Sequence, residues 1–560
     1  MKIFNKLFLS AAVVASSLTF GSCTGDMDLL PTDPKSQTAD KFKNDPAGYM
    51  QALIADVYLQ YATYGVNDNA AVKNFDGGMS TFQRSAWLLE EAMSDEASWI
   101  PNDADYGLFQ YGLIPADNNV VMGTYSRFFI NIALCNQFIQ TVNDGYFNIA
   151  GNPELESMAA EFVRQAKVLR AGAYWYAIDC FGDVPYLDEN SEMGQVGPQL
   201  GRTELFNRLT QGLEEVVAEY KAIDPNQKAK YGYVGLDVAE SLLVKYYLNA
   251  EVYTGTPQWG KCLEHANAVI NRLKGPGFQG SGLCNYYHQN FAYSNKQMSI
   301  GGANAVNEII WNIPQDQHNL VSYANGTFLL NGLIGTSVDS DTWRLNPLER
   351  YNAGASGWKC IVARRQFVEK FEWNSDFSYS PDQRTALWCT AADGFGIDCT
   401  VLDQEHYGNN GFLPVKFTNY ALDEFGEIDR DNSPAPTDKL GIDCPMIRLA
   451  EIYLSAAEAA LHEGQNELAL TYTNYVRERA GMPAYSVITL QELQDERCRE
   501  LYYESVRRSD LIRYGKWISG YTWQWKGYEA AGTDFPSNFN LFPLPASVCA
   551  RNGYHQNPGY

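Results

Sequence analysis

Apolar and polar positions follow a helical period over residues 446–464, MIRLAEIYLSAAEAALHEG. Two adjacent rows of apolar side chains form a broad stripe opposite a polar row, which predicts an amphipathic helix ending at Gly464. The next segment, NELALTYTNYVRERAG, predicts a second helix that ends at Gly481 and Pro483. Two helices, small residues at their crossing and a length of about 34 residues are typical of a tetratricopeptide-type hairpin.

The same helical pattern recurs earlier in the chain, at 45–65, 161–187 and 239–273. Regions 66–120 and 275–440 are rich in Gly, Asn, Tyr and Trp and lack a helical period, so they are predicted to be long loops with a few short strands. The sequence therefore predicts a mainly α fold, in which tetratricopeptide-like hairpins form a scaffold for irregular loops. We expect one domain over 45–560, with helical units near 45–65, 155–273 and 446–481.

Residues 1–22 have the order of a signal peptide, with a charged start, a short apolar run and then Gly21 and Ser22. Small residues directly before Cys23 resemble a bacterial lipobox, which implies cleavage before Cys23 and a lipid on its sulfur. Phe20 departs from the commoner Leu or Val, and an ordinary signal peptide with an unrelated cysteine is the alternative. Residues 23–44 are polar and without period, and are predicted to be a lipidated tether.

Charge and hydropathy narrow the possible partners. The formal net charge is −24, and no basic stripe offsets it, so the field repels nucleic acid and anionic lipid head groups. We therefore expect no nucleic-acid partner. After the leader, no stretch approaches the ~18 apolar residues of a membrane span, so the lipid on Cys23 is the predicted membrane attachment.

The cysteines and histidines show no metal-binding pattern. No pair of cysteines has CxxC or zinc-ribbon spacing, and the six histidines include no HExxH. The sequence therefore predicts no metal and no cofactor. Most cysteines are expected to be buried as small apolar residues. Export permits disulfides, and Cys389 with Cys399 is the pair for which one is considered.

Several motifs resemble the SusD/RagB family of outer-membrane, nutrient-binding lipoproteins. ERCRELYYESVRRSDLIRYG, at 496–515, matches the family's C-terminal signature, except that Ser505 stands where Gly is usual, a difference that bears on a close helix contact. FPLPASVCARNGYHQNPGY matches its terminal segment, and the QNPGY tail is expected to be docked. LRAGAYWYAIDCFGDVPYL and PDQR also match, and Glu308 to Trp311 resembles the family's buried strand. The matching positions of the signature are Glu496, Arg497, Glu500, Leu501, Glu504, Arg507, Asp510, Leu511, Arg513 and Gly515.

The resemblance implies a non-catalytic function at the cell surface. Family members capture glycans and pass them to a TonB-dependent (SusC-like) transporter, on which they sit as a lid. Asp26 and Asp28, directly after Cys23, resemble the signal that sends lipoproteins to the outer face of the outer membrane. The chain is therefore expected to be anchored in the outer membrane by its lipid and exposed at the surface.

The resemblance also implies a ligand surface built from the early loop region and a second set of loops. Aromatic rings stack on the C–H faces of sugars, while amides, carboxylates and the planar Arg fork bind hydroxyl groups. Trp99 is predicted to be a stacking platform, and Trp358 is a reserve candidate. A tryptophan near a proline often serves packing instead, and this alternative stays open for each aromatic residue. The predicted carbohydrate-binding residues are Asp76, Arg84, Trp99, Asn102, Tyr323 and Trp343.

Other functions were weighed against glycan capture. Glu496, Glu500 and Glu504 are spaced four apart, but as many arginines lie nearby, so an ion-pair network is predicted, with Glu504 pairing to Arg507 or Arg508. A glycoside hydrolase needs two carboxylates about 5–10 Å apart across a cleft, and no motif selects such a pair. An enzyme is therefore not expected. A tetratricopeptide-type protein-interaction scaffold, or a peptide-cargo lid of the same kind of transporter, remains the alternative.

Overall fold

The computed structural model describes most of the chain, and all structural statements concern that part. The described residues are 44–63, 80–99, 109, 112–191, 195–296, 305–320, 325–334, 347–354, 357–358, 360–399 and 410–560.

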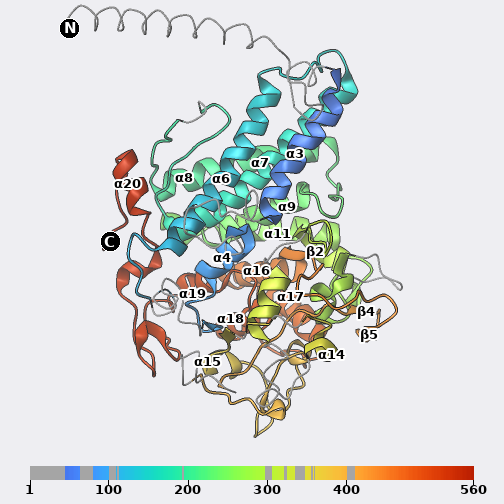
Figure 1. Ribbon diagram of the computed structural model, residues 1–560, viewed down its shortest axis with the longest axis vertical. Helices are drawn as coiled ribbons and strands as arrows, with labels where there is room; N and C mark the ends of the chain where they lie inside the picture. The colour runs from blue at the N-terminus through green and yellow to red at the C-terminus, as the bar shows by residue number, and fades with distance from the viewer. Residues whose placement is uncertain are drawn as a thin grey trace, which may run out of the picture.

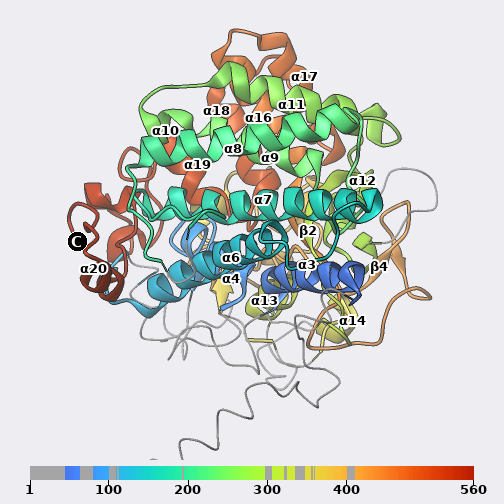
Figure 2. The same ribbon diagram turned by 90° about the horizontal axis from the view of Figure 1, so that it is seen from above.

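Helices packed side by side form the larger part of the structure (Figure 1), and Figure 2 shows them in successive rows from α6 to α17. Neighbours along the array contact each other in the order α6–α7–α8–α9–α11–α16–α17, and α3 packs against α6 and α7. This arrangement confirms the mainly α fold class. The helices are α3 (Pro46–Ala62), α6 (Asn119–Asn143), α7 (Pro153–Phe181), α8 (Arg202–Ile223), α9 (Leu236–Leu248), α10 (Ala250–Thr254), α11 (Trp259–Leu273), α16 (Leu449–His462) and α17 (Asn466–Arg479).

Local signals account for the ends of the long helices. The Asn118 carboxamide accepts hydrogen bonds from the amides of Val120 and Val121, which starts α6. Asn152 caps α7 in the same way, and Pro153 occupies its first turn, where no amide donor is required. Gly182, at φ 70°, ends α7 in a conformation that favours glycine.

Short helices carry the remainder of the scaffold. Four of them, α4, α12, α13 and α15, lie in regions that were predicted to be long loops with short strands, and the long helix α6 was not predicted. They correct the sequence interpretation of 66–120 and 275–440. The short helices that bear on the site are α4 (Phe82–Glu90), α12 (Ala305–Glu308), α13 (Asn325–Leu333), α15 (Arg365–Val368), α18 (Leu490–Leu501), α19 (Arg507–Arg513) and α20 (Ala546–Asn552).

The described residues contain three antiparallel two-stranded sheets. Strand β2 (Ile309–Ile313) pairs with β6 (Cys444–Arg448), and every residue of both is buried. This confirms a buried strand after Glu308 and corrects the predicted helix at 446–464, which begins only at Leu449. The other pairs are β1 (Ser98–Trp99) with β3 (Ile361–Val362) and β4 (Ala421–Leu422) with β5 (Ile428–Asp429).

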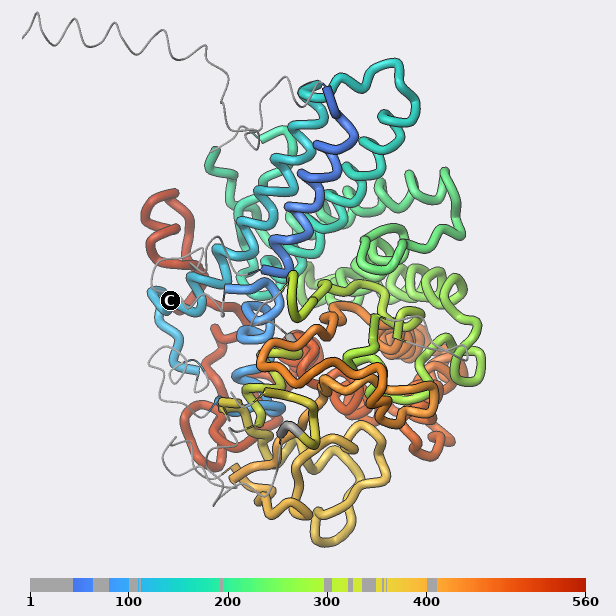
Figure 3. The backbone as a smooth tube through the Cα atoms, turned by 45° about the vertical axis from the view of Figure 1, so that its right-hand side comes forward, coloured from blue at the N-terminus to red at the C-terminus, as the bar shows by residue number. Residues whose placement is uncertain are grey.

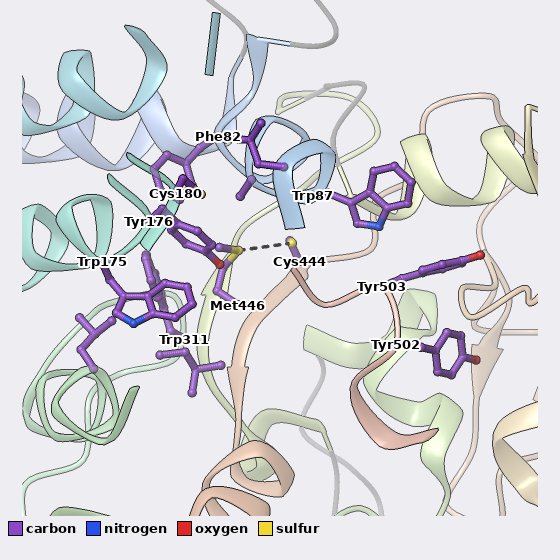
Figure 4. Packing of buried hydrophobic residues seen from close by; sticks show 14 of the residues in the cluster. Phe82, Trp87, Trp175, Tyr176, Cys180, Trp311, Cys444, Met446, Tyr502 and Tyr503 are labelled. Atoms are coloured by element: carbon purple, nitrogen blue, oxygen red, sulfur yellow. Dashed lines mark hydrogen bonds between the residues drawn. The ribbon is translucent and has the colours of Figure 1, made fainter. Parts of the chain in front are cut away.

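The core lies where α4, α7 and the β2–β6 pair meet, and it is rich in aromatic and sulfur-containing side chains (Figure 4). Phe82 and Tyr176 make an edge-to-face contact with centroids 5.6 Å apart, and Tyr61 meets Trp311 at 5.9 Å. Figure 3 shows the long connections after residue 350 gathered at the end of the array away from the α6–α7 turn. None of the described helices combines the length and apolar character that a membrane span requires.

An ion-pair network ties the C-terminal motif to the scaffold, as predicted. Glu496 pairs with Arg384 at 2.7 Å, and Glu500 pairs with Arg448 at 2.9 Å and with Arg479. The predicted partners of Glu504 were wrong. It binds Arg448 and Lys416, at 2.6 and 2.7 Å. The reason is that α18 ends at Leu501, so the helical spacing no longer applies at Glu504.

The structure also bears on three smaller expectations. Cys389 and Cys399 are both buried, and no disulfide joins them in the structure. Ser505 has φ 62°, a left-handed conformation that favours glycine, so its departure from Gly also bears on the backbone conformation. The predicted docking of the tail is confirmed, because the Asn557 carboxamide donates to the carbonyls of Phe181 and Phe542.

Candidate functional site

The predicted site residues fall into two groups. Asp76, Asn102, Tyr323 and Trp343 lie outside the described residues, as does Cys23, and their roles remain predictions. Arg84 and Trp99 are described, and the structure brings them together although they lie on different elements, α4 and β1.

An aromatic cluster joins these two residues, and we call it the Phe328 cluster. Its members are Arg84, Trp87, Trp99, Phe328 and Trp358. The Arg84 guanidinium carbon lies 4.3 Å from the centre of the Phe328 ring and 5.5 Å from that of Trp358. The rings of Trp99 and Phe328 stack with centroids 6.0 Å apart, and Trp87 meets Phe328 edge to face at 5.0 Å. Phe328 is thus the centre of the cluster.

Elements from distant parts of the sequence hold the cluster. Helix α13 carries Phe328 and contacts both α4 and β3. Strand β3 pairs with β1, with Trp99 opposite Ile361. Arg364, directly after β3, donates from Nε to the carbonyl of Ala97 at 2.8 Å, which fixes the start of β1.

Trp99 does not present an open ring, contrary to expectation. It is 3% exposed, and its ring packs against Phe328. The packing alternative therefore describes Trp99 in this structure. Trp358, the reserve candidate, is half-buried and is the partly open aromatic member of the cluster.

Most of the other buried arginines among the described residues form ion pairs with carboxylates. Arg508, for comparison, forms ion pairs with Asp179 at 2.8 Å and Glu90 at 3.2 Å. Within the described part of the chain no carboxylate pairs with Arg84, although the residue is only 5% exposed and its Nε has no hydrogen-bond partner. Its guanidinium lies instead over the faces of Phe328 and Trp358.

The C-terminal signature clamps the connection between α4 and β1. The Arg507 guanidinium makes two parallel hydrogen bonds to Asp95, from Nε at 2.7 Å and from Nη2 at 2.8 Å. The backbone amides of Tyr503 and Val506 donate to Glu96 and Glu91, at 3.0 and 3.1 Å. The family signature therefore positions the segment that carries Arg84 and Trp99.

Burial and neighbouring charges separate the pKa values of these acids. Burial alone would raise the pKa of Asp95, but the Arg507 guanidinium outweighs it and lowers that pKa to about 2. Burial raises the pKa of Glu96 to about 7, against the attraction of Arg507, and raises that of Glu91 well above its usual value. Asp95 is therefore ionised and anchors this segment, whereas the raised pKa values of Glu91 and Glu96 shift both toward their protonated forms.

A neighbouring group of potential metal ligands already holds a cation. One ligand atom each from Glu90, Asp179 and Cys180 lies within 4.8 Å of the others. The Arg508 guanidinium, however, is hydrogen-bonded to both carboxylates. The positive charge required by these acids is therefore supplied by arginine, and the donor set does not fit a metal ion.

Sequence reasoning missed the central residue of the site. Phe328 lies in the segment NGTFLL, whose apolar residues give no signal of a role different from core packing. Only the contact of α13 with α4 and β3 places it beneath Arg84 and Trp99.

The fold and site define a class: a mainly α protein in which a tetratricopeptide-like helical array supports a largely buried aromatic cluster that holds an arginine. The model of the SusD family matches residues 402–560. The starch-binding protein SusD of Bacteroides thetaiotaomicron is 29% identical, and the alignment covers 100% of this chain and 99% of that protein. A SusD-like protein of Bacteroides ovatus is 22% identical over 94% of this chain and 87% of its own length.

Solved structures agree on the fold. A SusD superfamily protein from Parabacteroides distasonis has a TM-score of 0.65 at 19% identity, covering 94% of this chain and 100% of that one. Surface glycan-binding protein A from Bacteroides thetaiotaomicron, in complex with laminarihexaose, has a TM-score of 0.62 at 18% identity, covering 91% and 99%. By these comparisons the chain is similar to proteins of the SusD family, through the family model at 402–560 and through its fold.

Proposed function

We propose that this chain is a surface-exposed glycan-binding lipoprotein of the outer membrane. It captures an oligo- or polysaccharide and delivers it, without cleaving it, to a partner TonB-dependent transporter. Two relatives support the ligand class, one named as a starch-binding protein and one described in complex with laminarihexaose. Because the two names mention different glycans, they support carbohydrate binding in general and not the binding of one particular sugar.

The observation that carries the proposal is the state of Arg84. A buried guanidinium normally forms ion pairs or several hydrogen bonds, because burying an unpaired charge is unfavourable. Arg84 instead lies over the rings of Phe328 and Trp358, with no carboxylate partner among the described residues. A sugar whose C–H face stacks on Trp358 would bring its hydroxyl groups to this fork of donors.

The placement of the nearby acids supports a binding role and not a hydrolytic one. Cleavage of a glycosidic bond needs two carboxyl groups that face the substrate. Glu90, Glu91, Asp95 and Glu96 lie close to the Phe328 cluster along the chain, but all four are at most 1% exposed. Their hydrogen bonds run inward, to α19 and the turn before it.

Affinity electrophoresis tests the proposal directly. The mature protein, without Cys23, is run through native gels cast with starch, laminarin and a panel of other plant, host and microbial polysaccharides. Arg84→Gln is compared with Arg208→Gln, which alters an exposed i,i+4 pair with Glu204 and serves as the matched control. We expect one glycan class to retard the wild type and Arg208→Gln but not Arg84→Gln. Retardation by no glycan, or equal retardation of all three proteins, would refute it.

Anchoring and delivery need separate tests. Cys23→Ser should abolish incorporation of labelled palmitate and release the protein from the outer-membrane fraction. The wild type should be digested by protease added to intact cells, and should co-purify with an outer-membrane transporter after mild detergent extraction. Retention of the label in Cys23→Ser, or protection of the wild type from added protease, would contradict this part of the proposal.

A further inference from the structure

A polar cavity lies beside Arg507, the residue whose guanidinium binds Asp95. Its volume is about 200 Å³, and it lies between α18, α19 and the loop at 516–521. Four charged side chains line it, namely Lys370, Arg507, Lys516 and Asp495. The lining is therefore net positive, in a chain whose formal net charge is −24.

The carboxylate and amide oxygens of this cavity are already engaged. Asp495 accepts from Lys370 at 2.8 Å and from the Gln491 amide at 2.9 Å. The Lys516 ammonium donates to the side-chain oxygens of Gln491 and Gln494, both at 2.5 Å. The oxygens of Asp95, behind the cavity, accept from Arg507 and Tyr521.

Several donors remain for a ligand. Arg507 is 3% exposed, and its Nε and Nη2 bind Asp95, so Nη1 has no hydrogen-bond partner among the described residues. The Gln494 amide nitrogen is likewise unused within the described part of the chain. Lys516 has three N–H donors, of which the two glutamines take two.

We infer that this cavity binds a small tetrahedral oxyanion, a sulfate or phosphate group. Converging donors from Arg and Lys, with the local acceptors already occupied, are the features that recognise such anions. Because a water molecule occupies about 30 Å³ in the liquid, the cavity has room for roughly six waters, or for one such group with some of its hydration. Burial, together with the like charges of Lys370 and Arg507, lowers the pKa of Lys516, and a bound anion would relieve this repulsion.

The oxyanion has two possible sources, a free inorganic anion or an ester carried by a sugar. This site is distinct from the Phe328 cluster, and its test uses no polysaccharide, so it can succeed or fail independently of the proposed glycan capture.

Isothermal titration calorimetry with sodium sulfate, against sodium chloride at matched ionic strength, tests the inference. Lys516→Met removes a donor and a charge, whereas Gln494→Glu places a carboxylate inside the cavity and retains an oxygen for Lys516. Lys274→Met, at the end of α11, makes the same charge change away from the site and serves as the control. Circular dichroism establishes that each variant is folded.

We expect one saturable sulfate site in the wild type and in Lys274→Met, with at least tenfold weaker binding in both cavity variants. Glucose 6-sulfate and glucose then separate the sources. Binding of the sulfated sugar assigns the site to a substituent on a glycan, and its exclusion while sulfate binds assigns it to a free anion. Absence of saturable sulfate binding in the wild type, or undiminished binding in both cavity variants, overturns the inference.

Discussion

Replacing Glu308 by Gln tests whether the buried ion-pair network holds the scaffold together. Glu308 ends α12 and is fully buried. One carboxylate oxygen accepts from Arg448 at 2.6 Å, and the other accepts from Arg479 and from the Cys284 amide, both at 2.8 Å. The substitution keeps the size of the side chain but removes its charge, and it turns one acceptor into a donor that faces an arginine.

The magnitude follows from two independent arguments. Burial opposes ionisation of Glu308, but Arg479 and Arg448 outweigh it and lower its pKa from 4.5 to about 2. At about 1.4 kcal/mol per pH unit, this shift corresponds to a contribution of about 3 kcal/mol to the free energy of unfolding at neutral pH. Removal of one member of a buried ion pair costs about 3–5 kcal/mol in other proteins, which agrees.

The direction of the pH dependence of stability follows from the sign of this pKa shift. Because the folded pKa is depressed, the stabilisation is complete above the unfolded value of 4.5 and is lost as the pH falls toward 2. Urea unfolding, followed by tryptophan fluorescence, should therefore give a deficit for Glu308→Gln of about 3 kcal/mol at pH 7 and about 2 kcal/mol at pH 3.5.

The matched control is Glu369→Gln, which alters a surface pair with Arg365 whose side chains are 45% and 38% exposed. Its expected effect is below about 1 kcal/mol. A Glu308→Gln deficit under 1 kcal/mol at pH 7, or one that does not shrink at pH 3.5, would refute the reasoning.

Three further substitutions test particular residues. Burial raises the pKa of Glu96 to about 7, above the usual 4.5, so the wild type should lose stability as the pH rises from 4.5 to 7. Glu96→Gln should not show this loss. Thermal melts at pH 5 and 8 in which the melting temperature declines equally in both proteins would contradict this prediction. Ser505→Gly should raise the free energy of unfolding by about 0.5–1 kcal/mol, because φ is 62° at this position. A lower free energy of unfolding in urea than that of the wild type would contradict this prediction. Trp99→Ala should lower the free energy of unfolding by about 3–5 kcal/mol, as for a core tryptophan. A loss under 1 kcal/mol would instead favour the interpretation of Trp99 as an exposed stacking platform.

The helices that could be predicted from the sequence are those with one polar, solvent-exposed face. The segment at 466–481 shows its period because polar residues face solvent on one side, and the structure forms α17 there. Helix α4 carries no such signal. All nine of its residues are buried, including Arg84 and Glu90, so its polar side chains meet tertiary partners instead of water.

Pairings between distant segments were beyond prediction. The short apolar run at 444–448 fits a helix or a strand equally well, and its pairing with β2, more than 100 residues earlier, decides the outcome. The ion-pair partners of Glu504 could not be predicted for the same reason. Its partner Arg448 lies 56 residues away, whereas the arginines next to it in sequence bind other acids. The residue types of an ion-pair network could be predicted, but its connections could not.

These connections explain what the family signature does. Asp95 and Glu96 are held by Arg507 and by the Tyr503 amide, which lie more than 400 residues further along the chain. Each of these four residues is at most 3% exposed. The signature therefore fixes the segment between Arg84 and Trp99, on which the proposed ligand surface depends. The similarity to the SusD family in this segment is consequently carried by residues that position the proposed site.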